Sequence, residues 1–163
     1  SFQDADLRSG KNIFSEVKQM VKQVEGKTAK KVARYTATSV YAQLISCCGL
    51  CLLGVDAMEY PLLDYINAAT GWDLKPEQYF SAGQRISALR KAFNVREGVR
   101  PADSKLHDRA LGRPPQTKGP LKGMAVAIET LEKTHYELLG YDPETGGPTQ
   151  KTLKDLSIDH LFT

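Results

Sequence analysis

The sequence lacks any segment long and apolar enough to cross a membrane or direct export. A membrane-spanning helix needs roughly 20 apolar residues, whereas the longest apolar run here, residues 45–55, is interrupted by two glycines. The first residues, Ser-Phe-Gln-Asp, have neither the basic start nor the apolar run of a signal peptide. We therefore expect a cytoplasmic protein that does not associate with membranes.

The sequence also has little excess charge of either sign. Its 22 lysines and arginines stand against 19 aspartates and glutamates, which leaves a net charge of +3. The densest basic run, residues 27–31, is typical of the polar start of a helix, whereas a nucleic-acid site needs a clustered basic stripe. We therefore expect no nucleic-acid partner.

Recognisable catalytic loops are missing as well. The sequence contains no glycine-rich dinucleotide or phosphate loop and no nucleophile elbow. Its three histidines, His107, His135 and His160, lie far apart in the sequence, so a histidine-based metal site has little support. His135 falls on the apolar stripe of a predicted helix, which favours a packed or hydrogen-bonded ring.

The hydrophobic pattern predicts an all-α fold. Apolar residues recur at helical spacing, and no alternating strand pattern is longer than about four residues. We expect an irregular bundle of five to six helices in one domain spanning residues 1–163, with residues 1–25 forming a lead helix. The predicted helices cover residues 12–24, 28–48, 61–70, about 75–98, 121–139 and 148–156, separated by glycine and proline breaks.

All three cysteines lie close together, at Cys47, Cys48 and Cys51. One interpretation is buried thiols at an apolar helix end, since free cysteine is among the most buried residue types. A second is a redox Cys-x-x-Cys pair, although such pairs normally open a helix rather than follow one. A third is metal or cluster ligation, which usually needs four ligands. Because few charges lie near this helix end, we expect it to be buried.

Three stretches resemble one known family. Residues 69–73 read Ala-Thr-Gly-Trp-Asp and lead into Gly-Gln-Arg-Ile at 83–86. Residues 91–98 read Lys-Ala-Phe-Asn-Val-Arg-Glu-Gly, and Gly-Tyr-Asp at 140–142 precedes Gly-Gly-Pro-Thr at 146–149. In this order and spacing they resemble the C-terminal helical region of aldehyde:ferredoxin oxidoreductases, the tungsten-pterin enzymes. The resemblance covers roughly residue 26 to the C-terminus.

The resemblance implies a role in redox catalysis. Enzymes of this family hold tungsten, or in some cases molybdenum, between two pterins beside a 4Fe-4S cluster. They oxidise aldehydes to carboxylic acids and pass the electrons to ferredoxin. The family's enzymes are several times longer, so the resemblance implies that this chain is the C-terminal piece of a longer oxidoreductase and that its partners include the missing N-terminal domains.

Particular residues take roles by position in the resemblance. Cys51 matches the cluster-ligating cysteine of the family's Asp-x-x-Gly-Leu-Cys motif, and it is the one metal ligand expected here. Gly49, Leu50 and Leu52 match positions where backbone meets a pterin. Ser46 occupies the position of the motif's acidic residue, and a hydroxyl accepts pterin N–H bonds more weakly than a carboxylate does.

Ser46 keeps a second class of function open. A helical interaction or scaffold domain could retain the family fold without the cofactor. In either case we expect the isolated chain to be inactive and to hold no cofactor, because most cluster ligands must come from elsewhere. The apolar surface around Leu50 would then favour homo-oligomers. Arg96 and Glu97, at a helix end, are predicted to form a structural ion pair.

Overall fold

The computed structural model describes residues 15–51 and 61–162. Within these ranges the chain forms helices and no strand, which confirms the predicted all-α class. The α-helices are α2 (Ser15–Lys22), α3 (Lys27–Cys47), α5 (Leu62–Thr70), α6 (Pro76–Arg96), α7 (Ile128–Leu139) and α8 (Gln150–Asp155). Short 3-10 helices are η1 (Pro101–Asp103), η2 (Asp108–Leu111) and η3 (Asp159–Phe162).

Most helix boundaries follow the sequence signals. Pro61 and Thr149 stand at the N-caps of α5 and α8, and the Thr149 hydroxyl accepts a hydrogen bond from the Thr152 amide at 3.2 Å. Gly71 ends α5 with a left-handed backbone. The predicted start of the first helix, at residues 12–14, lies outside the described residues.

The predicted helix over 121–139 begins later than expected, at Ile128. Gly123 adopts a φ of 72°, which an α-helix cannot contain. The Val126 amide donates to the Leu111 carbonyl at 2.8 Å, and this bond holds the segment as an irregular loop beside η2. Met124, which would lie on the inner side of a helix over 121–139, is 60% exposed as a result. An apolar pattern at helical spacing was misleading here because the backbone hydrogen bonds are made to another segment.

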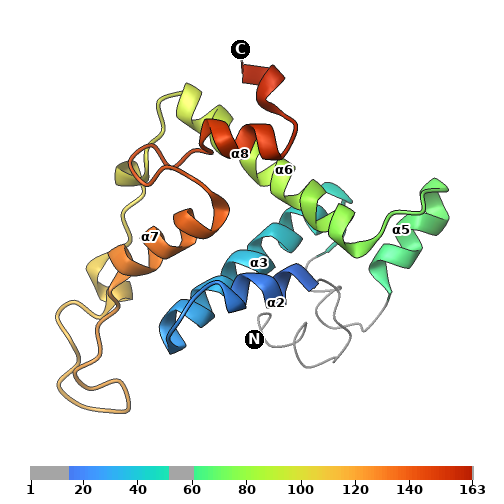
Figure 1. Cartoon of the computed structure of the whole chain (residues 1–163). Coiled ribbons are helices and arrows are strands. Elements are labelled where there is room, and N and C mark those ends of the chain that lie inside the picture. Colours follow the sequence, from blue (N-terminus) through green and yellow to red (C-terminus); the bar gives the residue numbers. More distant parts are fainter. Residues whose placement is uncertain (1–14, 52–60, 163) are drawn as a thin grey trace.

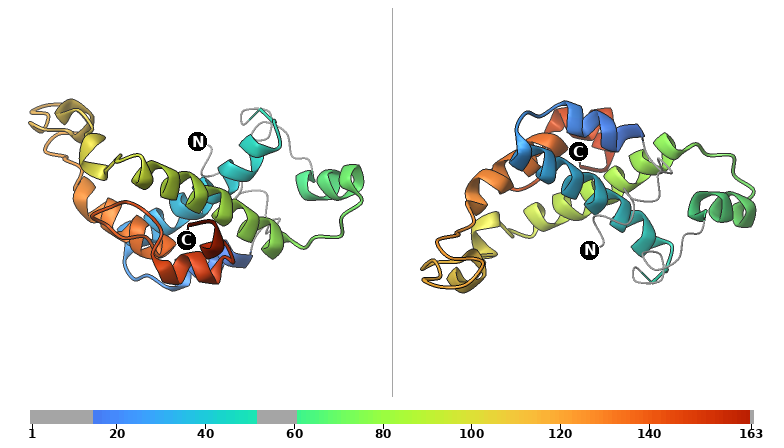
Figure 2. Two further views of the ribbon diagram at one scale, coloured as in Figure 1. Left: turned by 90° about the horizontal axis from the view of Figure 1, so that it is seen from above. Right: turned by 90° about the horizontal axis from the view of Figure 1, so that it is seen from below.

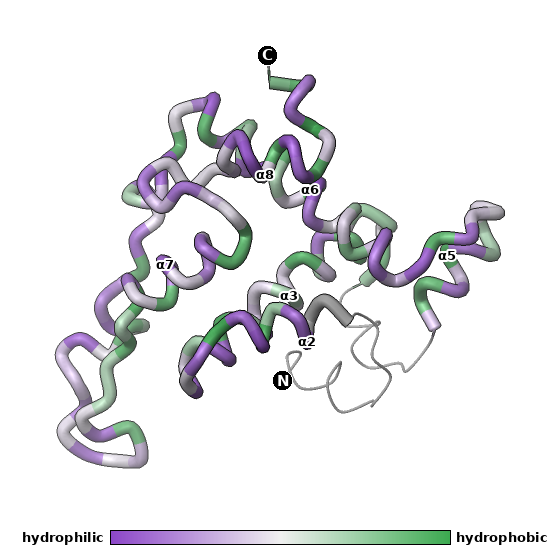
Figure 3. Tube along the Cα trace, viewed as in Figure 1, coloured by the Kyte–Doolittle hydropathy of each residue, from purple (hydrophilic) through white to green (hydrophobic). Residues whose placement is uncertain are grey.

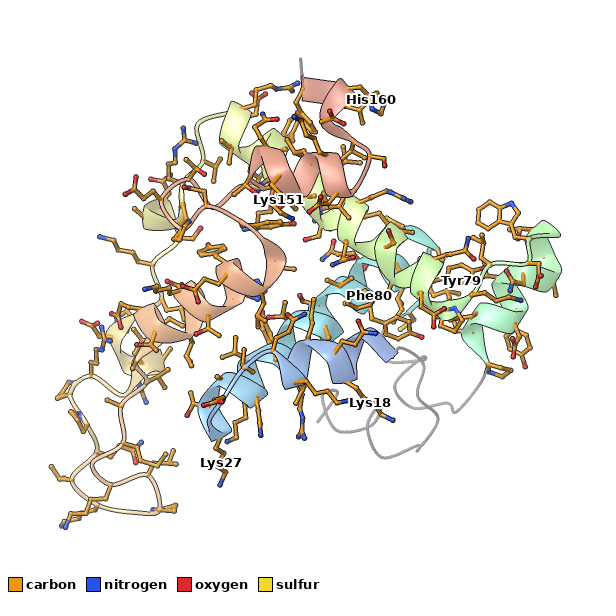
Figure 4. The ribbon with its side chains drawn as sticks, viewed as in Figure 1. Lys18, Lys27, Tyr79, Phe80, Lys151 and His160 are labelled. Atoms are coloured by element: carbon orange, nitrogen blue, oxygen red, sulfur yellow. The ribbon has the colours of Figure 1, made fainter. Side chains whose placement is uncertain are left out.

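Helix α3 is the centre of the fold and packs against α2, α6 and α7 (Figure 1). Its buried stripe repeats at helical spacing from Val32 to Ile45. Figure 4 marks Tyr79 and Phe80, which extend this core from the N-terminal half of α6. The buried members of this cluster are Met20, Ala33, Ala37, Val40, Tyr41, Leu44, Ile45, Leu62, Tyr79 and Phe80.

Helices α3 and α6 approach each other closely at Gly83. A Cβ at this position would lie 2.6 Å from the Val40 carbonyl oxygen and 3.0 Å from the Val40 Cγ1. The absence of a side chain therefore lets the two helix backbones meet. A glycine inside a helix costs stability through backbone entropy, and here the close crossing accounts for it.

A second cluster, around Ala88 on α6, holds the C-terminal segment to the bundle. Its other buried members are Tyr141, Leu153, Leu156 and Ile158. The turn between α7 and α8 closes on itself, because the Thr152 hydroxyl and the Thr149 amide both donate to the Gly140 carbonyl, at 2.6 and 3.1 Å. The Arg85 Nε donates to the Leu156 carbonyl at 2.9 Å and ties this segment to α6.

The molecule is elongated, with α5 at one end and the loop before α7 at the other (Figure 2). Helix α5 is joined to α6 through the side chain of Asn67. Its amide nitrogen donates to the Leu74 carbonyl at 3.0 Å, and its oxygen accepts from the Leu74 amide and from the Tyr79 hydroxyl at 3.2 and 2.6 Å. Hydrophilic and hydrophobic residues are interspersed along most of the trace, as Figure 3 shows.

Candidate functional site

The candidate site is the turn that ends α3, residues 46–51. Cys48 caps the helix and Gly49 follows with a φ of 70°. The Gly49 amide donates to the Ser46 carbonyl at 3.1 Å, and the Leu50 amide donates to the Ile45 carbonyl at 3.3 Å. This pair of bonds is a Schellman motif, which requires the left-handed backbone that glycine adopts without strain. The predicted helix break at Gly49 is confirmed, and Cys51 follows directly after the reversal.

The end of α3 is exposed, and the prediction that it is buried is wrong. Ile45 is fully buried, whereas each residue from Ser46 to Cys51 is exposed. The reason is that the buried cluster that α3 shares with Tyr79 and Phe80 of α6 ends at Ile45 on α3. Leu50 is 38% exposed despite its apolar side chain. Residues with a core-like composition therefore form a surface here.

All three thiols are free and exposed, so the interpretation of buried packing cysteines is contradicted. Partial desolvation raises the pKa of the Cys48 thiol, and the neighbouring Cys47 raises it further. A raised pKa lowers the fraction of thiolate, so Cys48 is a weaker nucleophile than an ordinary cysteine. Within the described residues, no three histidine, cysteine, aspartate or glutamate side chains are grouped to hold a metal.

The residues of this turn fit a cofactor only as one edge of its binding site. A four-iron cluster takes four thiolates, and the described part of the chain offers Cys51 without a grouped set of further ligands. Apart from its own chain neighbours, none of the described residues has an atom within 4 Å of a Cβ built on Gly49, so this part of the structure leaves the backbone open to a neighbouring group. Ser46 places an exposed hydroxyl one turn earlier. Leu52 lies outside the described residues.

His135 is a structural histidine, as its position on the apolar stripe predicts. Its Nδ1 lies 2.7 Å from the hydroxyl of Thr36, which is fully buried on α3. Burial lowers the pKa of the imidazole, and the positive charge of Lys91 lowers it further. The ring is therefore neutral at physiological pH and links α7 to α3.

Arg96 and Glu97 form the predicted ion pair at the end of α6, with 2.8 Å between Nε and Oε1. The guanidinium also lies over the Phe93 ring, 4.8 Å from its centroid. Both charged side chains are largely exposed, so the pair contributes little stability. Asn67, by contrast, was missed by the sequence reasoning, because a single asparagine in a short helix gives no signal of its three bonds to residues seven and twelve positions away.

An all-helical domain with a cysteine-bearing turn at its surface is thus defined by the described residues. Comparison with known families identifies the family to which the chain belongs. The sequence model of the family described as "Aldehyde ferredoxin oxidoreductase, domains 2 & 3" matches residues 4–158. The chain belongs to this family. No solved structure matches it.

Curated relatives agree with the family match. The chain is 34% identical over 122 residues to the tungsten-containing aldehyde ferredoxin oxidoreductase of Pyrococcus abyssi, which covers 73% of the chain and 20% of that relative. It is 36% identical over 123 residues to the Pyrococcus furiosus protein of the same description, with the same coverage of 73% and 20%. The chain therefore spans about a fifth of the length of these relatives. Among the described residues, no helix combines the length and apolarity that a membrane span requires.

Proposed function

We propose that this chain is the C-terminal helical part of a cytoplasmic tungsten-pterin oxidoreductase. The whole protein would oxidise aldehydes to carboxylic acids and deliver the electrons to ferredoxin. The observation that carries the proposal is the exposed turn after α3, which places a free thiol at Cys51, in a chain that belongs to this family. When bound, the tungsten or molybdenum bis-pterin supplies the oxidation chemistry and the 4Fe-4S cluster conducts the electrons.

Each residue of the turn has a part in this proposal. Cys51 is the metal ligand and provides one thiolate of the cluster. Gly49 and Leu50 offer open backbone to a pterin, since the reversal at Gly49 turns the chain away from α3. Leu52 continues this contact. Cys47 and Cys48 take no ligand role, because they match no ligand position in the family's motif.

The proposal is tested by replacing thiols one at a time in the full-length protein. Cys51→Ser is expected to lower the iron content and to remove the signal of the reduced cluster in electron paramagnetic resonance. Cys47→Ser is the matched control, because that thiol is equally exposed and lies four residues away. Equal iron content in the two variants would reject Cys51 as a ligand.

The isolated chain is proposed to bind no stable cluster, since four thiolates are needed. Anaerobic incubation with iron and sulfide, followed by desalting, should leave no charge-transfer absorbance. Retention of about four irons per chain would show a self-sufficient cluster domain. The exposed Leu50 surface is proposed to drive self-association until the remaining domains cover it.

A non-catalytic scaffold is the second candidate, and Ser46 is the observation that favours it. The motif's carboxylate would accept pterin N–H bonds with charge assistance, worth about 1.5–3 kcal/mol before desolvation. Ser46→Asp in the full-length protein should therefore raise pterin retention if the site is used. Unchanged or lower cofactor content, together with no cluster-ligand cysteines upstream in the parent sequence, would favour the scaffold.

A further inference from the structure

Two of the sequence runs that carry the family resemblance, 91–98 and 146–149, contribute residues to a cavity that does not include the α3 turn. Its volume is about 130 Å³, and its walls come from α6, η1, α7 and the turn between α7 and α8. Asn94 and Val95 belong to the run 91–98, and Gly146 belongs to the run 146–149. The proposed cofactor contacts make no use of these residues.

The cavity is firmly built by close backbone packing. A Cβ on Gly146 would lie 2.8 Å from the Cγ of Pro101, and one on Gly147 would lie 2.7 Å from the Cγ2 of Val95. Both glycines are buried. Arg100 is fixed at the rim, since its Nη1 donates to the Val95 and Val99 carbonyls at 2.9 and 3.3 Å. Segments far apart in the sequence are thus held at a fixed spacing.

The cavity lining is rich in hydrogen-bond donors. Lys91 and Arg100 contribute positive charges, and Asn94 and Tyr136 contribute neutral donors. Burial raises the pKa of the Tyr136 hydroxyl, and the charge of Glu132 raises it further, so the hydroxyl keeps its proton. Among the described residues, neither Lys91 nor Glu132 takes part in an ion pair.

Apolar groups of Val95, Val99 and Pro101 lie among these donors. With two cations against the single carboxylate of Glu132, the lining carries an excess positive charge. A ligand suited to both kinds of group has an anionic head and a short hydrocarbon tail. A phosphate ion lacks the tail, and a zwitterionic amino acid would require Glu132 to hold its ammonium.

We propose that this cavity binds a short-chain carboxylate, with its head towards Lys91 and Tyr136 and its tail against Val95 and Val99. Carboxylic acids are the products of the proposed reaction, so the choice of natural ligand rests on the proposed function, whereas the binding itself does not. The cavity would then serve as a product-binding site that does not include the residues of the α3 turn.

The test is a nuclear magnetic resonance titration of the 163-residue chain with propionate, without any metal or pterin. Saturable shifts are expected, and propionamide, the neutral isostere, should not reproduce them. Lys91→Met should weaken binding about tenfold, because it removes a charged hydrogen bond while keeping the length of the side chain. Lys133→Met, an exposed lysine on α7 outside the cavity, is the control and should bind as the unaltered chain does.

Tyr136→Phe gives a second variant that removes only the hydroxyl and should weaken propionate binding several-fold. The proposal is overturned if propionate does not bind saturably, if propionamide binds equally well, or if both variants keep full affinity. Tighter binding of alanine than of propionate would also overturn it, in favour of a zwitterion site. Because no cofactor is present, these outcomes are independent of the cluster-ligand test at Cys51.

Discussion

Helix α3 lies in two opposite environments. It is tightly packed where it crosses α6, and it is exposed at its last turn. At the crossing, Gly83 meets the Val40 carbonyl with no room for a methyl group. At the last turn, Gly49 has open space around it. Both positions need glycine, one because of a neighbouring backbone and the other because of its own φ. The crossing is therefore fixed by packing within this chain, whereas the turn is exposed among the described residues.

The largest change in stability is expected where α3 crosses α6. Gly83→Leu should lower the free energy of unfolding by about 3 kcal/mol, because the new side chain must displace the α3 backbone. Chemical denaturation followed by circular dichroism measures it. Gln84→Leu, next to it on α6 and half-buried, is the control and should change stability much less. Equal effects at the two positions would show that the crossing is not tightly packed.

The pH dependence of stability tests the other contact of α3, between Thr36 and His135. The lowered pKa of the folded imidazole means that the unfolded chain binds more protons as the pH falls below about 6.5. Stability should therefore be complete above that pH and decrease below it, until the folded pKa is reached. Unfolding curves between pH 7.5 and pH 5 measure the slope. His135→Gln should reduce the slope, and an unchanged slope would assign it to other groups.

A smaller effect is expected at the exposed turn. Gly49→Ala should cost about 1 kcal/mol, because alanine is strained at a φ of 70° although nothing crowds its methyl group. Gly49→Asn should cost less, since asparagine tolerates the left-handed region better. Thermal unfolding of the two variants provides the measurement. If alanine and asparagine are equally tolerated, the backbone reversal is not required.

The smallest effect concerns thiol chemistry at the same turn. In a chain that keeps only Cys48, an aromatic disulfide reagent at pH 8 should react more slowly with the folded than with the unfolded protein, because the folded thiol has a raised pKa. The reaction should nevertheless proceed without unfolding, since the side chain is exposed. Reaction only in denaturant would mean that the last turn is covered after all.

The periodicity of apolar residues was enough to predict the all-α class, the position of α3 and the inward-facing His135. It could not reveal that Ser46 to Cys51 are exposed, because an apolar helix end has the same composition whether its neighbours lie in this chain or outside it. The late start of α7 was equally hidden, since Val126 pairs with Leu111 across a loop. The roles of Ser46, Gly49, Leu50, Cys51 and Leu52 remain predictions, because they concern groups that bind from outside.

The closed turn between α7 and α8 bears on the order in which the chain folds. Its bonds from Thr149 and Thr152 to Gly140 join residues at most twelve positions apart. Short loops of about ten residues close in roughly 10–100 ns, and local contacts of this kind carry a small entropic cost. The bond between Thr36 and His135, in contrast, spans 99 positions. We therefore expect the C-terminal turn to form early in folding and then to pack against α6. The long-range link from α7 to α3 is expected to form later.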